Sequence, residues 1–390
     1  MQVNNSKMVL YFKNVNERIR TFEKNGVLKD TSTPINKNIW SKVHLIYILF
    51  YSLIDFFLLT ILLFNSKFVK EKVSVVYTTA NLCSFQNNKY SERIIQNIEI
   101  EKRVYINQGR EKIIKKIDGY KVYNLGGIVK LFSFVFCFMD KQNKLLKAYH
   151  LVNNFVLFFL NGKNVYLLCH YDLNGISVVF SKHRQKINLI EVQHGGMINY
   201  PAYSSPSKVK IADTFIVKNA QTIEYLKSHL NKNFIDVSYT LLPYPKVVKV
   251  KKKAVHFLYA STVEIGGLYA SFLEYLKIHA AVSATISIRL HPRELKNKSI
   301  FEEQIRGIKK DITFDDSKCW LTHNNIENLI VISPWSSIIE EAFDNSFKVI
   351  ILDVLGKDRY DYLIDNENVY YASNPIEIAS IIEKLTVNYI

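Results

Sequence analysis

The chain has 390 residues, which favours about two domains of ordinary size over a single compact domain. Apolar residues make up 48% of the sequence and charged residues 22%, a balance that excludes disordered and fibrous proteins. The 51 lysines and arginines exceed the 35 acidic residues and give a formal charge of +16, which favours a polyanionic partner such as nucleic acid, anionic lipid or a phosphate-bearing small molecule.

Sequence motifs bear on the class of partner, and the cysteines bear on the cellular compartment. The sequence has no zinc-finger spacing, no RNP-type aromatic motif and no strong helix-turn-helix signal, so we expect no nucleic-acid partner. Its N-terminal residues lack the apolar region of a secretory signal. Four widely separated cysteines without a CxxC pair are typical of reduced thiols: Cys83, Cys137, Cys169 and Cys319. These patterns together predict a cytoplasmic protein.

Residues 43–64 are almost entirely apolar, with His44 and Asp55 as their ionisable side chains. This length is sufficient to cross a bilayer, but Asp55 would be costly in hydrocarbon. Three interpretations stay open: a helix that caps or enters the core, a helix in the membrane interface, and a true span. In the second, the protein would lie at the inner face of the cytoplasmic membrane, with an anionic surface near Lys42, Lys67, Lys70 and Lys72.

Predicted strands and helices then alternate along the chain. The first series has strands at residues 72–80, 120–130, 164–172, 187–193 and 210–219. Two prolines and a lysine run mark a boundary near residues 243–253. The second series has strands at residues 254–262, 283–294, 327–337 and 348–354, of which the last is the final strand.

This alternation predicts parallel sheets covered by helices on both faces. We therefore expect an α/β protein of two Rossmann-like domains that face each other across a cleft. Residues 1–245 form the first domain with a helical N-terminal extension, and residues 254–390 form the second.

Polar turns follow three strands of the second series, where open α/β sheets bind ligands. The turns are Ser261 with Thr262, residues 289–294, and residues 333–337. Ser336 and Ser337 precede a predicted helix, where hydroxyls and backbone N–H groups bind anions or simply cap the helix. Together the turns predict a site for a nucleotide mono- or diphosphate, composed of Ser261, Thr262, Arg289, His291, Pro292, Arg293, Ser333, Ser336, Ser337 and Glu341.

Glu340 and Glu341 stand one turn into that helix. One of them can accept hydrogen bonds from ribose hydroxyls, and the other can complement the helix dipole. We assign the ribose role to Glu341.

The first series ends two strands in "CHYD" (169–172) and "EVQHGG" (191–196). Glycines there allow close approach of a substrate, and the ordinary pKa of His194 suits a general base that deprotonates a hydroxyl. The alternative is a histidine that only hydrogen-bonds its loop. Asp172 and Glu191 are rival bases, and Glu191 is less favoured because its side chain would point into the sheet.

Other chemistries lack their motifs. No GxxxxGK[ST], GxGxxG, GxSxG or zinc-ligand spacing occurs, which argues against P-loop, dinucleotide, serine-elbow and zinc enzymes. The paired aspartates of "FDDS" (314–317) are interpreted as a solvated turn rather than a metal site. We expect neither a metal nor a cofactor.

The motifs "EVQHGG", "RLHPRE" and "VISPWSSIIEEAF", in this order around a basic boundary, resemble GT-B glycosyltransferases of bacterial surface polysaccharide synthesis. The likeness covers about residues 160–355 and is to the group of sialyltransferases, polysialyltransferases and capsule Kdo transferases. It implies that His291 and Pro292 contact the donor phosphate and that Ser336 and Ser337 bind it. The acidic-Gly motif of the sialyltransferases would fall on residues 193–195, where Gln and His replace the acidic pair.

The resemblance thus implies a metal-independent transferase that moves a sugar from a nucleotide-sugar donor, with a CMP-linked sugar favoured, to a hydroxyl of a glycan or lipid-linked glycan for capsule or lipopolysaccharide. His194 would deprotonate the acceptor, while His291 and Arg289 stabilise the departing phosphate with the two serines. Two alternatives stay open: a CDP-polyol phosphotransferase of the teichoic-acid type, and a non-catalytic glycan-binding protein.

Overall fold

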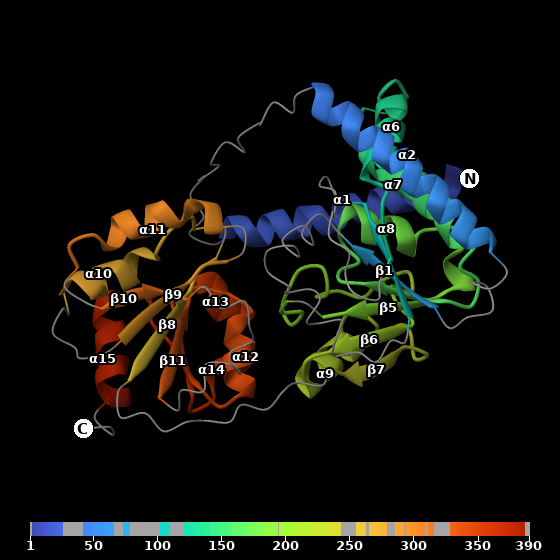
Figure 1. The fold of residues 1–390 in the computed structure, drawn as a ribbon. Helices are drawn as coiled ribbons and strands as arrows, with labels where there is room; N and C mark the ends of the chain where they lie inside the picture. Colours follow the sequence, from blue (N-terminus) through green and yellow to red (C-terminus); the bar gives the residue numbers. More distant parts are fainter. Residues whose placement is uncertain are drawn as a thin grey trace. The chain divides into compact units, whose positions relative to one another are not determined.

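A computed structural model of the chain describes residues 2–25, 42–65, 73–78, 102–108, 121–139, 141–193, 195–242, 255–262, 265–278, 285–291, 294–308, 311–315 and 328–386. Several residues singled out from the sequence lie outside these ranges: His194, Pro292, Arg293, Lys67, Lys70, Lys72 and the boundary segment 243–253. The chain divides into two compact units (Figure 1). The first extends to residue 243 and the second from residue 244 to the end, except that residues 19–35 and 198–200 group with the second.

The first unit contains a seven-stranded sheet with the order β3-β2-β1-β4-β5-β6-β7. Its strands are β1 (Val73–Thr78), β2 (Lys102–Asn107), β3 (Lys121–Asn124), β4 (Asn164–Leu167), β5 (Asn188–Val192), β6 (Thr214–Val217) and β7 (Ser238–Leu241). Every pairing is parallel, so all carboxyl ends lie at one edge of the sheet.

Helices of the first unit connect and cover these strands. They are α1 (Gln2–Asn25, of which the part up to Arg18 groups with this unit), α2 (Lys42–Phe64), α6 (Gly126–Cys137), α7 (Lys144–Phe158), α8 (Leu173–Val179) and α9 (Ala220–Ser228), with the 3₁₀ turn η2 (Arg184–Lys186). Met8 of α1, Leu146 of α7 and Ile176 of α8 are buried together in one cluster. The N-terminal helix therefore belongs to the packed structure at Met8.

The second unit contains a six-stranded parallel sheet with the order β10-β9-β8-β11-β12-β13. Its strands are β8 (His256–Ala260), β9 (Thr285–Arg289), β10 (Ile312–Phe314), β11 (Leu329–Ser333), β12 (Lys348–Ile351) and β13 (Val369–Tyr371). Its helices are α10 (Ala270–Ile278), η3 (Leu295–Asn297), α11 (Lys298–Ile305), α12 (Ile338–Asp344), α13 (Val354–Arg359), α14 (Asp361–Ile364) and α15 (Pro375–Thr386). Numbered from its own first strand, the order is 3-2-1-4-5-6, the order of the Rossmann fold.

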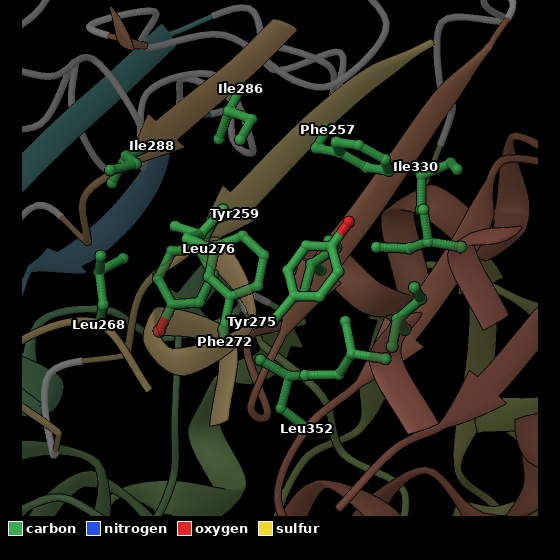
Figure 2. Packing of buried hydrophobic residues seen from close by; sticks show 14 of the residues in the cluster. Phe257, Tyr259, Leu268, Phe272, Tyr275, Leu276, Ile286, Ile288, Ile330 and Leu352 are labelled. Atoms are coloured by element: carbon green, nitrogen blue, oxygen red, sulfur yellow. The ribbon is translucent and has the colours of Figure 1, made fainter. Parts of the chain in front are cut away.

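Alternation along β8 shows why both faces of this sheet are covered. Phe257 and Tyr259 pack on one side with α10, α11 and α15, while Leu258 and Ala260 pack on the other with α12, α13 and α14. Figure 2 shows the first of these clusters, in which the Tyr259 and Phe272 rings stack with centroids 4.9 Å apart. Period-two burial on two apolar faces is what a doubly wound sheet requires.

The predicted fold class is confirmed, because both units are α/β with parallel sheets. The element list is corrected in four places. The predictions missed the short edge strands β7 and β10 and the interior strand β2, whose sequence KRVYIN is polar at both ends. In addition, β13 follows the segment at residues 348–354 that was expected to be last. In the described ranges no helix is sufficiently long and apolar to cross a membrane.

Candidate functional site

Strand order reverses at one point in each sheet. In the first unit the reversal lies between β1 and β4, and in the second between β8 and β11. Connections leave such neighbouring strands in opposite directions, and open α/β sheets bind ligands beyond the carboxyl ends at this switch point. The residues that follow β8 and β11 therefore form the first place to search.

Ser333 joins the carboxyl ends of β8 and β11. Its Oγ donates a hydrogen bond to the carbonyl oxygen of Ala260 at 2.9 Å and accepts one from the backbone N–H of Ser336 at 3.1 Å. The side chain is fully buried. Ser333 was predicted as a phosphate ligand, but its hydroxyl is engaged by the protein and fixes the turn that carries Ser336.

Ser261 does the same for the His-Pro turn. Its N–H donates to the carbonyl oxygen of Arg289 at 3.0 Å, and its Oγ accepts from the N–H of His291 at 2.8 Å. The hydroxyl in turn donates to the carboxylate of Glu294, which is buried. Ser261 was also predicted as a ligand, and the structure gives its hydroxyl two protein partners instead.

Four other predicted residues carry groups suited to a ligand. Thr262 is buried beside Ser261, and its Oγ1 has no hydrogen-bond partner in the part of the chain that the structure describes. Ser336 and Ser337 are partly exposed. Ser337 occupies the cap position of α12 without a side-chain cap bond, so the plain capping interpretation is wrong for it. His291 is also partly exposed at the neighbouring turn.

Arg289 forms an ion pair at the edge of this site. Its Nε and Nη2 lie 2.7 and 2.5 Å from Oδ2 of Asp315, and both side chains are 13% exposed. Asp315 directly follows β10, so the interpretation of "FDDS" as a solvated turn is wrong at this residue. The carboxylate compensates the guanidinium charge, so Arg289, which was predicted to contact phosphate, supports the turn through this ion pair.

The two glutamates of α12 are both buried. Oε1 of Glu340 accepts a hydrogen bond from the Tyr362 hydroxyl at 2.8 Å. Burial, together with the charge of Glu340, raises the pKa of Tyr362, so the phenol stays protonated and donates. Glu340 therefore anchors α14 to α12, and Glu341 remains the predicted ribose ligand.

In the first unit, a buried histidine and glutamate lie at the carboxyl ends of β4 and β5. His170 Nδ1 is 3.0 Å from Oε2 of Glu191, and the Tyr203 hydroxyl donates to Oε1 at 2.6 Å. His170 and Glu191 are 0% and 1% exposed. His170 Nε2 has no hydrogen-bond partner within the described ranges. The sequence pointed to the "CHYD" turn but not to His170, and Tyr203 carried no motif at all.

This cluster anchors the loop that contains His194. Glu191 lies before the loop and Tyr203 after it, and the buried Gln193 accepts from the N–H of Lys218 at 2.7 Å. Glu191 is excluded as an accessible base because it is buried and its oxygens already bind His170 and Tyr203. His194 itself lies outside the described residues.

Asp172, the other rival base, caps α8 by accepting from the N–H of Gly175 at 2.5 Å. Burial raises the pKa of Asp172 to about 6, against the effect of this hydrogen bond and one from Cys169. Burial also raises the pKa of the Cys169 thiol, which excludes it as a thiolate nucleophile at neutral pH. Among the residues with described positions, no group of three or more His, Cys, Asp or Glu side chains is arranged to hold a metal ion.

Comparisons with known proteins give structural likeness only. No protein-family model and no curated protein matches the sequence. The structure resembles a UDP-GlcNAc 2-epimerase from Neisseria meningitidis (14% identity, 82% of this chain and 93% of the other, TM-score 0.49). It also resembles the lipopolysaccharide outer core galactosyltransferase WaaB (12%, 82% and 91%, TM-score 0.47) and the wall teichoic acid polymerase TagF (10%, 89% and 90%, TM-score 0.45).

We predict that Gly175→Ala destabilises the first unit. An added Cβ would lie 2.2 Å from the carbonyl oxygen of Cys169 and 2.7 Å from Cα of His170, so α8 must move away from the turn that holds His170. We expect a loss of about 1–3 kcal/mol in the free energy of unfolding, measured by urea denaturation. Gly195→Ala is the matched control, because nothing lies within 4 Å of its added Cβ. Equal stability of the two variants would contradict the close contact.

Ser333→Ala tests the connection between β8 and β11. The variant leaves the Ala260 carbonyl and the Ser336 N–H without their partner, so we expect a loss of about 1–3 kcal/mol in the free energy of unfolding. Ser271→Ala is the control, since Ser271 is also buried in this unit and its hydroxyl has no partner in the described structure. A larger loss for Ser271→Ala than for Ser333→Ala would contradict this assignment.

Asp172→Asn tests the partly buried carboxyl of Asp172 through the pH dependence of stability. Because burial raises the folded-state pKa to about 6, ionised Asp172 costs stability above that pH, and the cost disappears as the pH falls through 6 toward the unfolded-state value. Asparagine keeps the cap without the charge. Wild type should therefore gain stability relative to Asp172→Asn as the pH falls from 7 to about 4, measured by thermal unfolding.

For Asp213→Asn we expect the opposite pH dependence: wild type should lose stability relative to this variant as the pH falls. Hydrogen bonds from Arg184, the Leu189 N–H and Lys210, with the charge of Arg184, outweigh burial and lower the pKa of Asp213. Its contribution to stability is therefore present at neutral pH and is lost as the pH falls through that lowered pKa. For the preceding variant, Asp172→Asn, a stability that changes with pH in parallel with that of the wild type would contradict the raised pKa of Asp172.

Proposed function

We propose that the chain is a glycosyltransferase of the GT-B type that binds a nucleotide-sugar donor in the second unit and a glycan acceptor in the first. One observation supports this most: Ser261 and Ser333 use their hydroxyls to hold the β8, β9 and β11 turns together at the switch point of a Rossmann-order sheet. The hydroxyls of Thr262, Ser336 and Ser337 lie at these turns, and the partly exposed His291 lies on the adjoining turn. Such groups suit a phosphate.

The donor phosphate would be bound mainly by hydroxyl and N–H groups. Ser336 and Ser337 offer hydroxyls, and His291 offers a ring N–H on the adjoining turn. Arg293 remains the predicted cationic contact, while Arg289 supports the turn through Asp315. Glu341 would accept bonds from the ribose. We keep the CMP-linked sugar as the favoured donor, and these contacts also suit a nucleoside diphosphate.

In the proposed reaction, His194 removes the proton from an acceptor hydroxyl. The hydroxyl oxygen forms a bond to the anomeric carbon as the bond from that carbon to the phosphate oxygen breaks, with inversion. Charge develops on the departing phosphate, where His291 and the two serines stabilise it. No step requires a metal, so turnover should persist in EDTA.

The anchored loop supports the choice of His194 as the base. Glu191, His170 and Tyr203 form buried hydrogen bonds with one another on either side of the loop in the sequence. Asp172 remains the alternative base, since its pKa of about 6 also suits proton transfer. The proposed acceptor is a bacterial surface glycan for capsule or lipopolysaccharide, reached at the cytoplasmic face of the membrane.

The test begins with a thermal-shift screen against CMP, CDP, UDP, GDP and dTDP, followed by a transfer assay with the matching nucleotide sugar. We expect one nucleotide to stabilise the protein and Ser336→Ala to weaken its binding about tenfold. Ser271→Ala should bind as the wild type does. His194→Ala should still bind the nucleotide but lose turnover by about 100-fold or more.

Each other outcome has a definite meaning. Near-normal turnover of His194→Ala with a large loss in Asp172→Asn would transfer the role of base to Asp172. Release of CMP together with a new phosphodiester would identify the CDP-polyol phosphotransferase. Tight binding of a polymer without nucleotide binding or turnover would contradict the enzyme and identify a glycan-binding protein.

A further inference from the structure

Helix α2 has one face that packs against the protein and one exposed apolar face. Ser52, Asp55, Leu59 and Leu63 lie on the face that packs against the protein: the Ser52 hydroxyl accepts from the N–H of Gly127 at 2.9 Å, and both leucines are buried. The charge in the middle of this helix is therefore turned inward.

Asp55 is held on that inner face by hydrogen bonds. Its Oδ2 accepts from the backbone N–H and the side-chain amide of Asn124, at 3.0 and 3.1 Å. The outer face is left without a charge over more than three turns. It exposes seven large apolar side chains: Phe50, Leu53, Ile54, Phe57, Leu58, Ile61 and Phe64.

The neighbouring helix α6 and the turn after it expose a second apolar face. Its residues have helical spacing and reach 80% exposure at Phe138: Leu131, Phe134, Val135, Phe138 and Met139. Of the 21 large apolar side chains that are exposed in the described ranges, 12 lie on these two faces. Figure 1 shows α2 and α6 next to each other, and the Ser52–Gly127 hydrogen bond joins them. We call these 12 residues the outer apolar face.

Positive charges predominate in the sequence of α6, α7 and the turn between them. Between residues 126 and 158 the sequence has four lysines, Lys130, Lys141, Lys144 and Lys147, and a single acidic residue, Asp140. Lys141 is exposed two residues after Met139. A second copy of this chain would bring the same lysines and a charge of +16 against them, whereas an anionic bilayer offers apolar acyl chains and a complementary charge.

We propose that the outer apolar face is a membrane-docking surface that inserts into one leaflet of an anionic bilayer, with α2 and α6 at the acyl boundary and the lysines at the phosphate groups. Aromatic and aliphatic side chains opposite a protein-packed face are the pattern of helices that lie in the interface. This inference does not depend on the proposed transferase activity.

Flotation of the full-length protein with vesicles tests it. We expect wild type to float with vesicles of phosphatidylcholine and phosphatidylglycerol, and about tenfold less with phosphatidylcholine alone. The double variant Phe57→Asp/Phe134→Asp should lose binding by about tenfold or more, because both side chains leave the hydrocarbon. Lys141→Gln should weaken binding to the anionic vesicles only.

Controls come from the same unit. Ile235→Asp changes a side chain that is 102% exposed and lies outside the outer apolar face, and Lys232→Gln changes an exposed lysine elsewhere, so both should float as wild type does. Circular dichroism melting verifies that each variant is folded. Absence of wild-type flotation would overturn the proposal, as would flotation that is unchanged in the double variant.

Light scattering tests whether a second copy of the chain covers the outer apolar face instead of a membrane. A stable dimer that the double variant dissociates, without any vesicle binding, would identify the face as an interface between copies and overturn the membrane assignment. Nucleotide binding in the second unit is measured separately by thermal shift. Failure of vesicle binding therefore leaves the proposed function standing, and failure of nucleotide binding leaves the docking surface standing.

Discussion

A parallel strand ends at the same edge of its sheet as its neighbours, and every described strand pairing in this chain is parallel. Polar turns that are far apart in sequence must therefore meet at that edge. In the second unit, Ser261 hydrogen-bonds to His291, and Ser333 hydrogen-bonds to Ala260, the residue before Ser261. These residues span more than 70 positions of the sequence. The site follows from the strand order before any ligand is considered.

Buried polar groups then make the edge rigid. Buried hydroxyls and carboxylates are stabilised by hydrogen bonds, and three of them here each join two segments. Ser333 joins β8 to β11, Ser261 joins β8 to the His-Pro turn, and Glu191 joins β4 to the loop before Tyr203. The backbone N–H groups of the partly exposed Ser336 and His291 are held by these bonds. Preorganisation of this kind is what the proposed transferase site would require.

Strand–helix alternation was sufficient to predict the fold class, because the central strands are continuous apolar runs. The edge strands β7 and β10 were missed because they are short and partly exposed, so their sequences carry no such run. For the site, residue type indicated which turns lie at the carboxyl ends of the strands, but not which hydroxyls are hydrogen-bonded within the protein. Ser261 and Ser333 look like ligands in sequence, and only their partners reveal a supporting role. The pairing of His170 with Glu191 required the register of β4 and β5.

The orientation of Asp55 was equally beyond the sequence, since a carboxylate in an apolar helix can face the protein or the lipid. Its bond to Asn124 removes the objection to an interfacial helix.

The central claim concerns the second unit, and hydrogen exchange with mass spectrometry tests it most directly. On addition of the nucleotide that stabilises the protein, the account predicts protection at residues 260–262, 289–291 and 333–341. Protection confined to the carboxyl edge of the first sheet, with these three segments unchanged, would contradict it.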